Sequence, residues 1–184
     1  MVIDTYKCIY VAVPKTGSKS IRSRIGWPVN FHEDITQIKQ GITLEKFNSY
    51  YKFGFVRNPW DRAVSLYHRV ERGHVRSSIS FDQFIYGHTR ATDTCIHPTP
   101  KVNQLDFFVD SKGHIVADYI GKFETLEQDW KHICNIINCP EVNLPHLNQS
   151  RHKHYTEYYN HATQDIIATR FAKDIEYFNY KFSD

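Results

Sequence analysis

Apolar residues gather in two short runs, at positions 8–13 and 51–56, and neither run alternates strictly between apolar and polar positions. Short runs of this kind are typical of strands buried on both faces of a parallel sheet. A polar segment and then residues at helical spacing follow each run, at 14–25 after the first and at 57–67 after the second. The pattern therefore predicts two strand–loop–helix units.

Residues that favour helix ends mark several further boundaries. Gly26 and Gly41 are expected to end helices that begin after the polar loop and near Glu33. Asn58 is a natural N-cap, with Pro59 in the first helical turn, where its missing N–H costs nothing. The remaining expected elements are capping boxes at 80–83 and 125–128, strands at 106–109 and 115–123 around a turn at 110–113, and helices from 126 to near 138 and over 163–178.

Strands that alternate with helices argue for an α/β fold. We expect a single P-loop-like domain over residues 1–184, with a mainly parallel central sheet flanked by helices. In such sheets ligands bind beyond the carboxyl ends of the strands. The segments after positions 13 and 56 are therefore the places to look for a site.

The segment 14–20 has the composition of an anion-binding loop. Gly17 lets the backbone approach a ligand closely, and the N–H groups of the following helical turn point toward an anion. Lys15 and Lys19 add positive charge, while Ser18 and Ser20 add hydroxyl donors. A plain basic turn between a strand and a helix is the other interpretation of this loop.

The loop is not a Walker A sequence. That pattern needs glycine at positions 13 and 18, where this chain has Val13 and Ser18, and only Lys19-Ser20 fits. An ordinary nucleoside triphosphatase is therefore disfavoured.

Arg57 and Ser65 form the second candidate pair. An arginine at a strand end can grip a phosphate bidentately, and a serine about two helical turns later can add one directed hydrogen bond. The alternatives are an ion pair between Arg57 and Asp61, and a small residue at a packed helix face for Ser65.

Four segments together resemble the sulfotransferases that use 3′-phosphoadenosine-5′-phosphosulfate (PAPS), in particular the branch that modifies carbohydrates. The loop resembles that family's 5′-phosphosulfate loop, and 55–67 resembles its 3′-phosphate segment, which is the most specific of the four. The other two resemble its segment near the adenine and its C-terminal signature, and they lie at 120–126 and 174–182.

The resemblance implies a role for each matching position. The 5′-phosphosulfate would be held by the loop residues Lys15, Thr16, Gly17, Ser18, Lys19 and Ser20. The 3′-phosphate would be held by Arg57 and Ser65, with Arg151 or Lys153 closing over it. The adenine would contact the later segment, at Lys122, Phe123 and Leu126.

Sulfuryl transfer depends on positioning and electrostatic stabilisation, with the entering and leaving oxygens in line. Lys15 would stabilise the leaving 5′-phosphate. The acceptor hydroxyl must lose a proton, and His32 is the first candidate for the base, with Glu33 second. Acceptor contacts are expected from His97, Gln104 and Arg69.

Composition restricts partners and location. The chain has 184 residues and a net charge of +3, which suits an anionic ligand. Without a Lys/Arg block we expect no nucleic-acid partner. No apolar window approaches about 18 residues and no signal-peptide pattern is present, so we expect no membrane association. Four scattered Cys and a His spacing that matches no zinc pattern predict a cytoplasmic protein without a metal.

Two other functions stay open at this point. One is a P-loop-type nucleotide or small-molecule kinase, which would want a Gly-rich loop and a carboxylate for Mg²⁺. The other is a non-catalytic module that binds polyanions. The acceptor, expected to be a carbohydrate, also stays open among polysaccharide, oligosaccharide, glycolipid, small alcohol and tyrosine, as does the oligomeric state.

Overall fold

The computed structural model describes residues 1–26, 32–72, 79–88, 102–140, 143–145 and 153–183. The chain forms two compact units. The first contains Met1–Val56 and Gln104–Leu147, and the second contains Arg57–Asn103 and Asn148–Asp184.

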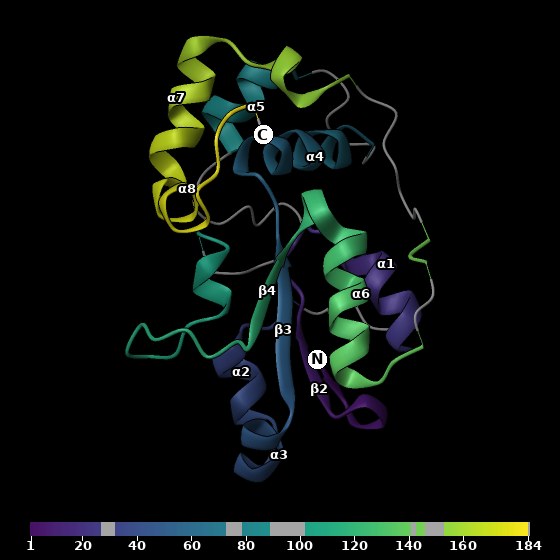
Figure 1. Ribbon diagram of the computed structural model, residues 1–184. Helices are drawn as coiled ribbons and strands as arrows, with labels where there is room; N and C mark the ends of the chain where they lie inside the picture. The colour runs from purple at the N-terminus through teal and green to yellow at the C-terminus, as the bar shows by residue number, and fades with distance from the viewer. Residues whose placement is uncertain (27–31, 73–78, 89–101, 141–142, 146–152, 184) are drawn as a thin grey trace. The chain divides into compact units, whose positions relative to one another are not determined.

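A four-stranded sheet is the centre of the first unit (Figure 1). Its strands lie in the order β1 (Val2–Ile3), β2 (Cys8–Val11), β3 (Tyr51–Val56) and β4 (Tyr119–Lys122). The short β1 is antiparallel to β2, whereas β2, β3 and β4 are parallel neighbours. The sheet is therefore mainly parallel and flanked by helices, which confirms the expected α/β class.

Alternation along β3 separates two faces of this sheet. Phe53 and Phe55 point to one face, where they pack in a core with Tyr10, Trp130 and Ile133. The helices on that face are α1 (Ser18–Ile25) and α6 (Leu126–Ile137). On the other face a Cβ at Gly54 would clash with Cε1 of Phe108, so glycine lets that ring lie directly on the strand.

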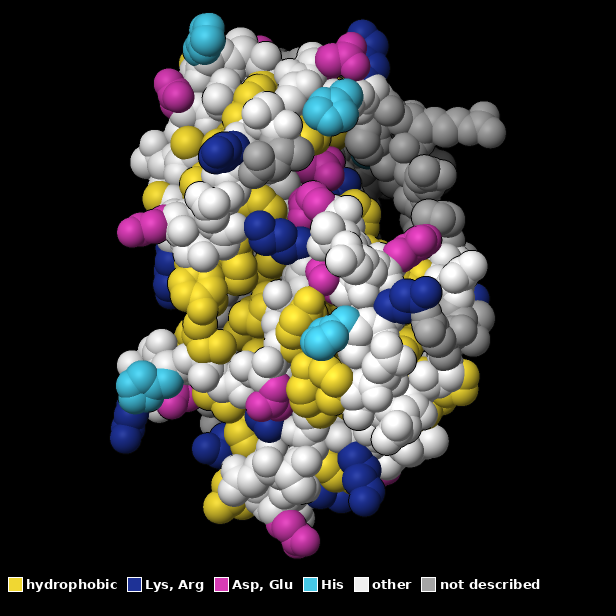
Figure 2. All heavy atoms as spheres, viewed as in Figure 1, with side chains coloured by type: hydrophobic (Ala, Val, Ile, Leu, Met, Phe, Trp, Pro, Cys, Tyr) yellow, Lys and Arg dark blue, Asp and Glu magenta, His cyan; other side chains and the backbone are white. Residues whose placement is uncertain are grey.

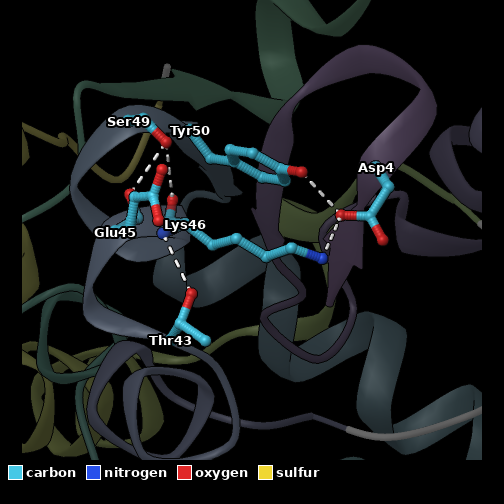
Figure 3. Close-up of polar contacts among 6 residues, drawn as sticks. All are labelled: Asp4, Thr43, Glu45, Lys46, Ser49 and Tyr50. Carbon is cyan, nitrogen blue, oxygen red and sulfur yellow. Dashed lines mark hydrogen bonds and ion pairs between the residues drawn. The ribbon is translucent and has the colours of Figure 1, made fainter.

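Two short helices lead into β3. The first, α2 (Ile35–Gln40), begins at the capping residue Asp34 and ends at Gly41, as expected. The second, α3 (Leu44–Ser49), was not expected. Figure 3 shows how α3 is tied to the 3₁₀ turn η1 (Asp4–Tyr6), because Asp4 Oδ1 accepts from Lys46 Nζ at 2.8 Å and from Tyr50 OH at 2.6 Å.

The second unit is helical, with an aromatic core. Its helices are α4 (Pro59–Arg72), α5 (Phe81–His88), the 3₁₀ turn η4 (Tyr155–Tyr158), α7 (His161–Arg170) and α8 (Ala172–Phe178). Phe81 meets Tyr159 edge-on with ring centroids 4.8 Å apart, and the ring centroids of Tyr67 and Phe84 are 5.6 Å apart. The expected capping box of α5 is confirmed, since Ser80 Oγ accepts from Gln83 N at 3.2 Å and Gln83 Oε1 accepts from Ser80 N at 2.9 Å.

Two expected strands are wrong in extent. Residues 105–107 form a 3₁₀ turn, η2 (Leu105–Phe107), and the hairpin after it has a single bridge between Val109 and Ile115. The Asp110 carboxylate accepts the N–H groups of residues 112 and 114, which tightens the turn and limits the pairing. Further on, the Asp118 side chain takes the N–H of Lys52, so the β4 ladder begins only at the next residue.

The expected helix at 163–178 is two helices. It breaks at Phe171, whose backbone leaves helical geometry with φ −108° and ψ 28°. The Phe171 ring is buried, and the Arg62 guanidinium lies 5.8 Å from its centroid.

Surface charge is mixed in sign. On the face drawn in Figure 2, Lys and Arg side chains are interspersed with Asp and Glu and do not form one basic field. Within the described ranges, no helix is both long and apolar enough to cross a membrane.

Candidate nucleotide-binding and active site

The loop between β2 and α1 has an unusual backbone. Lys15 and Gly17 both adopt left-handed conformations, with φ 72° and φ 78°, and Gly17 is the N-cap of α1. Left-handed residues in a turn direct successive N–H groups toward one side and form a concavity that binds anions. The N-terminus of α1 adds its own N–H groups and partial positive charge at the same place. This backbone geometry is compatible with the expected anion cradle, and the binding of an anion there stays a prediction.

The side chains of the loop differ in how far they are buried. Thr16 is fully buried, and its hydroxyl donates to the Val13 carbonyl at 3.0 Å. Its side chain thus shapes the loop. Ser18 and Ser20 are also buried, whereas Lys15 is half-buried and Lys19 is exposed. The two lysines supply the positive side-chain charge of the loop.

Gly17 brings the loop against the second predicted nucleotide segment. A Cβ at Gly17 would lie 2.9 Å from Cδ2 of Leu126 and 3.3 Å from Cδ2 of Phe123. Phe123 belongs to the 3₁₀ turn η3 (Phe123–Thr125), and Leu126 begins α6. The structure therefore places two segments more than 100 residues apart in sequence side by side, and both were predicted to bind one nucleotide.

Gly17→Ala should lower the free energy of unfolding by about 2 kcal/mol. About half of that loss comes from left-handed strain on alanine, and the rest comes from the displacement of Leu126 and Phe123. The matched control is Gly26→Ala, because Gly26 is also left-handed (φ 77°) but a Cβ there has nothing within 4 Å. Urea unfolding of both variants measures the loss in the free energy of unfolding. Equal losses in Gly17→Ala and Gly26→Ala would refute the close contact at Gly17.

His32 lies at the base of the loop. Its Nδ1 is 2.6 Å from the carbonyl oxygen of Ala12, the residue after β2. A carbonyl can only accept, so Nδ1 carries the proton and, in the neutral ring, Nε2 carries the lone pair. The capping box of α2 fixes the chain just after His32, since Asp34 Oδ1 accepts from Gln37 N at 3.0 Å and Gln37 Oε1 accepts from Asp34 N at 3.0 Å. Glu33, the second candidate base, is exposed.

The residues expected to contact the acceptor were Gln104, His97 and Arg69. Gln104 is completely buried, which favours a structural role for its side chain, and its main-chain carbonyl accepts from Phe107 N at 3.1 Å. His97 lies outside the described residues, and Arg69 is described only by its backbone within α4.

Arg57 follows β3 directly and opens the second unit. Its Nε donates to Asp61 Oδ2 at 2.8 Å, and its Nη2 lies 2.7 Å from the same oxygen. The ion pair considered from the sequence is thus present. It uses one edge of a guanidinium that has five N–H donors, and it holds the plane of that group in a single orientation.

Asn58 anchors the start of α4 to the C-terminal segment. Its Oδ1 accepts from Trp60 N at 3.1 Å, which confirms the expected N-cap, and its Nδ2 donates to the Lys181 carbonyl at 2.8 Å. Phe182 packs edge-on against Trp60, with centroids 5.7 Å apart. The two segments predicted from family likeness, 55–67 and 174–182, are therefore parts of one packed structure.

The other residues predicted to bind the 3′-phosphate are Ser65, Arg151 and Lys153. Ser65 is buried on α4, one turn beyond Asp61 and two beyond Arg57. Lys153 is exposed, 3.9 Å from Glu157 Oε2, and Arg151 lies outside the described residues.

Asp129 was not among the residues singled out from the sequence. The expected capping box at 125–128 is wrong, because Thr125 Oγ1 makes no cap and donates instead to Asp129 Oδ2 at 2.8 Å. Asp129 also accepts from Lys122 N, within the predicted adenine segment. An acidic residue in the first turn of a helix is usually assigned to the helix dipole, and nothing local in the sequence points to these longer contacts.

Comparison with known proteins identifies the family. An uncharacterized protein from Archaeoglobus fulgidus is 29% identical over 104 residues, covering 56% of this chain and 81% of the relative. The crystal structure of a sulfotransferase from Alicyclobacillus acidocaldarius aligns with a TM-score of 0.44 at 18% identity, and the alignment covers 74% of this chain but only 57% of that one. A model of the sulfotransferase family matches residues 1–181, nearly the whole chain, and the protein therefore belongs to that family.

Proposed function

We propose that this protein transfers a sulfuryl group from PAPS to an acceptor hydroxyl. The observation that carries the proposal is the loop at 14–20, where left-handed Lys15 and Gly17 turn the backbone into an anion cradle at the N-terminus of α1. The family match supports the reaction, because sulfuryl transfer needs such a cradle for the group that leaves.

The donor would be bound through its phosphates. The loop N–H groups, Lys15 and Lys19 take the 5′-phosphosulfate, while Arg57 and Ser65 take the 3′-phosphate. The Asp61 carboxylate supports this role for Arg57 because it holds the guanidinium in place. Phe123 and Leu126, which line Gly17, contact the adenosine end.

The reaction is an in-line displacement at sulfur. An oxygen of the acceptor hydroxyl forms a new S–O bond while the bond between sulfur and the bridging oxygen of the 5′-phosphate breaks. Lys15 and the loop N–H groups stabilise the negative charge that grows on that phosphate. His32 Nε2 takes the proton of the acceptor hydroxyl, and the Ala12 carbonyl holds the tautomer that makes this nitrogen basic. The products are the sulfate ester and adenosine 3′,5′-bisphosphate.

We assign a carbohydrate hydroxyl as the acceptor. The support is the likeness of 14–20 and 55–67 to the branch of the family that modifies carbohydrates. A transfer assay with radiolabelled PAPS against polysaccharides, oligosaccharides, glycolipids, small alcohols and tyrosine peptides tests the assignment. Labelling of tyrosine peptides alone would overturn it and leave the donor assignment intact.

Adenosine 3′,5′-bisphosphate should raise the melting temperature by about 5–10 °C at a concentration near 100 times its Kd, because a ligand that binds only the folded state shifts unfolding by mass action. Differential scanning fluorimetry measures the shift, with adenosine 5′-monophosphate as the comparison ligand. The absence of a shift, or a larger shift with ATP and Mg²⁺, would refute PAPS as the donor, and the second outcome would favour a kinase.

A further inference from the structure

Asp129 connects three parts of the chain through one carboxylate. Its Oδ1 accepts from Tyr119 OH at 2.8 Å, and its Oδ2 accepts from Lys122 N at 2.8 Å and Thr125 Oγ1 at 2.8 Å. These donors lie on β4, at the end of that strand and in η3. Burial, and then the hydrogen bond to Asp129, raise the pKa of Tyr119 to about 12, so its hydroxyl stays a donor at neutral pH.

Gly121 lets the carboxylate approach the strand this closely. A Cβ at Gly121 would lie 3.0 Å from Cβ of Asp129 and 2.7 Å from Cε1 of Phe55. The helix α6 therefore rests directly on β4 at this point. A glycine in the strand and an acidic residue in the helix together fix the path of the chain from β4 into α6.

The segment held in this way is the one that touches the anion loop. Phe123 lies between Lys122 and Thr125, which both donate to Asp129, and Leu126 follows Thr125 directly. The side chains of Phe123 and Leu126 contact Gly17. The distance between the loop and this turn determines where an adenine can lie once the 5′-phosphate is bound in the loop. A group that fixes the turn therefore acts on the base of the nucleotide more than on its phosphates, which the loop itself binds in the proposed function.

We infer that Asp129 is a positioning residue for recognition of the nucleotide base. It holds the turn at 122–126 in the conformation that places Phe123 and Leu126 against the loop. The inference rests on the proposed function, because it takes the ligand of the loop to be an adenosine bisphosphate. Asp129 does not itself touch the nucleotide in this assignment.

A role confined to the helix dipole would give a different pattern. Glu127 lies in the same first turn of α6 and is exposed, so it interacts with the dipole about as well as Asp129 does. Asp129 differs because both of its oxygens accept donors that lie before α6 begins. Glu127→Gln is therefore the matched control for the loss of a carboxylate from this turn.

The test compares adenosine 3′,5′-bisphosphate with guanosine 3′,5′-bisphosphate, which has the same phosphates on a different base. Asp129→Asn replaces one accepting oxygen by a donor, and it should weaken adenosine 3′,5′-bisphosphate binding by about five- to tenfold. The guanosine compound should lose less than about twofold, so the preference for adenine shrinks. Tyr119→Phe removes one hydrogen bond and keeps the ring, and it should shift the preference in the same direction by about two- to threefold.

Isothermal titration calorimetry of the wild type and the three variants separates the possible outcomes. A role limited to stability would weaken both ligands equally, and Tyr119→Phe covers the case in which Asp129→Asn does not fold. The role of Asp129 would be overturned, with the proposed function intact, by either of two results. One is an unchanged preference for the adenosine bisphosphate in Tyr119→Phe and in folded Asp129→Asn. The other is a change of that preference in Glu127→Gln as large as in Asp129→Asn. A wild type that binds neither bisphosphate would overturn the proposed function and the inference together.

Discussion

Replacing His32 with alanine should lower the rate of sulfuryl transfer by about 100- to 10,000-fold, the range typical of a lost general base. Nucleotide affinity should stay within about twofold, because the phosphates are assigned to other groups. The physical reason is the 2.6 Å contact between Nδ1 and the Ala12 carbonyl, which makes Nε2 the basic nitrogen. Steady-state kinetics with a saturating donor, together with calorimetry of adenosine 3′,5′-bisphosphate, separates the two effects.

The pH dependence sharpens this test. A histidine base acts only when neutral, so wild-type turnover should rise with pH through the range where imidazole loses its proton, near neutral pH. His32→Ala should lose this rise. His161→Ala, which removes an exposed histidine at the start of α7, should keep it. Normal turnover in His32→Ala together with a loss of turnover in Glu33→Gln would transfer the role of base to Glu33.

Local chemistry explains which parts of the fold could be predicted. The run at 51–56 became β3 with the expected bounds, because a buried parallel strand must be apolar on both faces. Helix ends were also predictable at Gly26, Gly41 and Asn58. At each of these positions a backbone conformation or a side-chain cap depends only on residues within one helical turn.

Bonds from side chains to backbone N–H groups accompany the errors. Where a strand was expected at 106–109, residues 105–107 form a 3₁₀ turn, and Asp110 accepts the N–H groups of residues 112 and 114 in the hairpin that follows. The ladder of β4 starts late because Asp118 takes a backbone N–H of β3 with its side chain. Propensity along the chain gives no sign of such bonds, since the deciding partner of Asp118 lies 66 residues away.

The candidate site shows the same division. The sequence order of Lys15, Thr16 and Gly17 predicted an anion loop, and the structure shows left-handed backbone at Lys15 and Gly17 within it. The inward turn of the Thr16 hydroxyl and the complete burial of Gln104 depend on the folded environment. Sequence therefore indicated the segments at 14–20 and 120–126, which the structure brings together at Gly17, but it did not separate the buried side chains of the loop from the exposed ones.

Arg57→Ala should weaken adenosine 3′,5′-bisphosphate by about 100-fold, since truncating a charged group that is bidentate to phosphate costs about 2–5 kcal/mol. Adenosine 5′-monophosphate, which lacks the 3′-phosphate, should lose less than about threefold. The variant leaves the Asp61 carboxylate without its ion pair, so a loss of stability is also expected.

The double variant Arg57→Ala/Asp61→Asn separates the loss of affinity from the loss of stability. Asparagine at 61 removes the charge that Arg57 neutralises across 2.7 Å, so the double variant should recover much of the stability that Arg57→Ala loses. It should not recover affinity for the 3′-phosphate, because the guanidinium is still missing. Urea unfolding and calorimetry on the same samples measure both quantities. Recovery of affinity together with stability would make Arg57 a structural residue and remove it from the 3′-phosphate site.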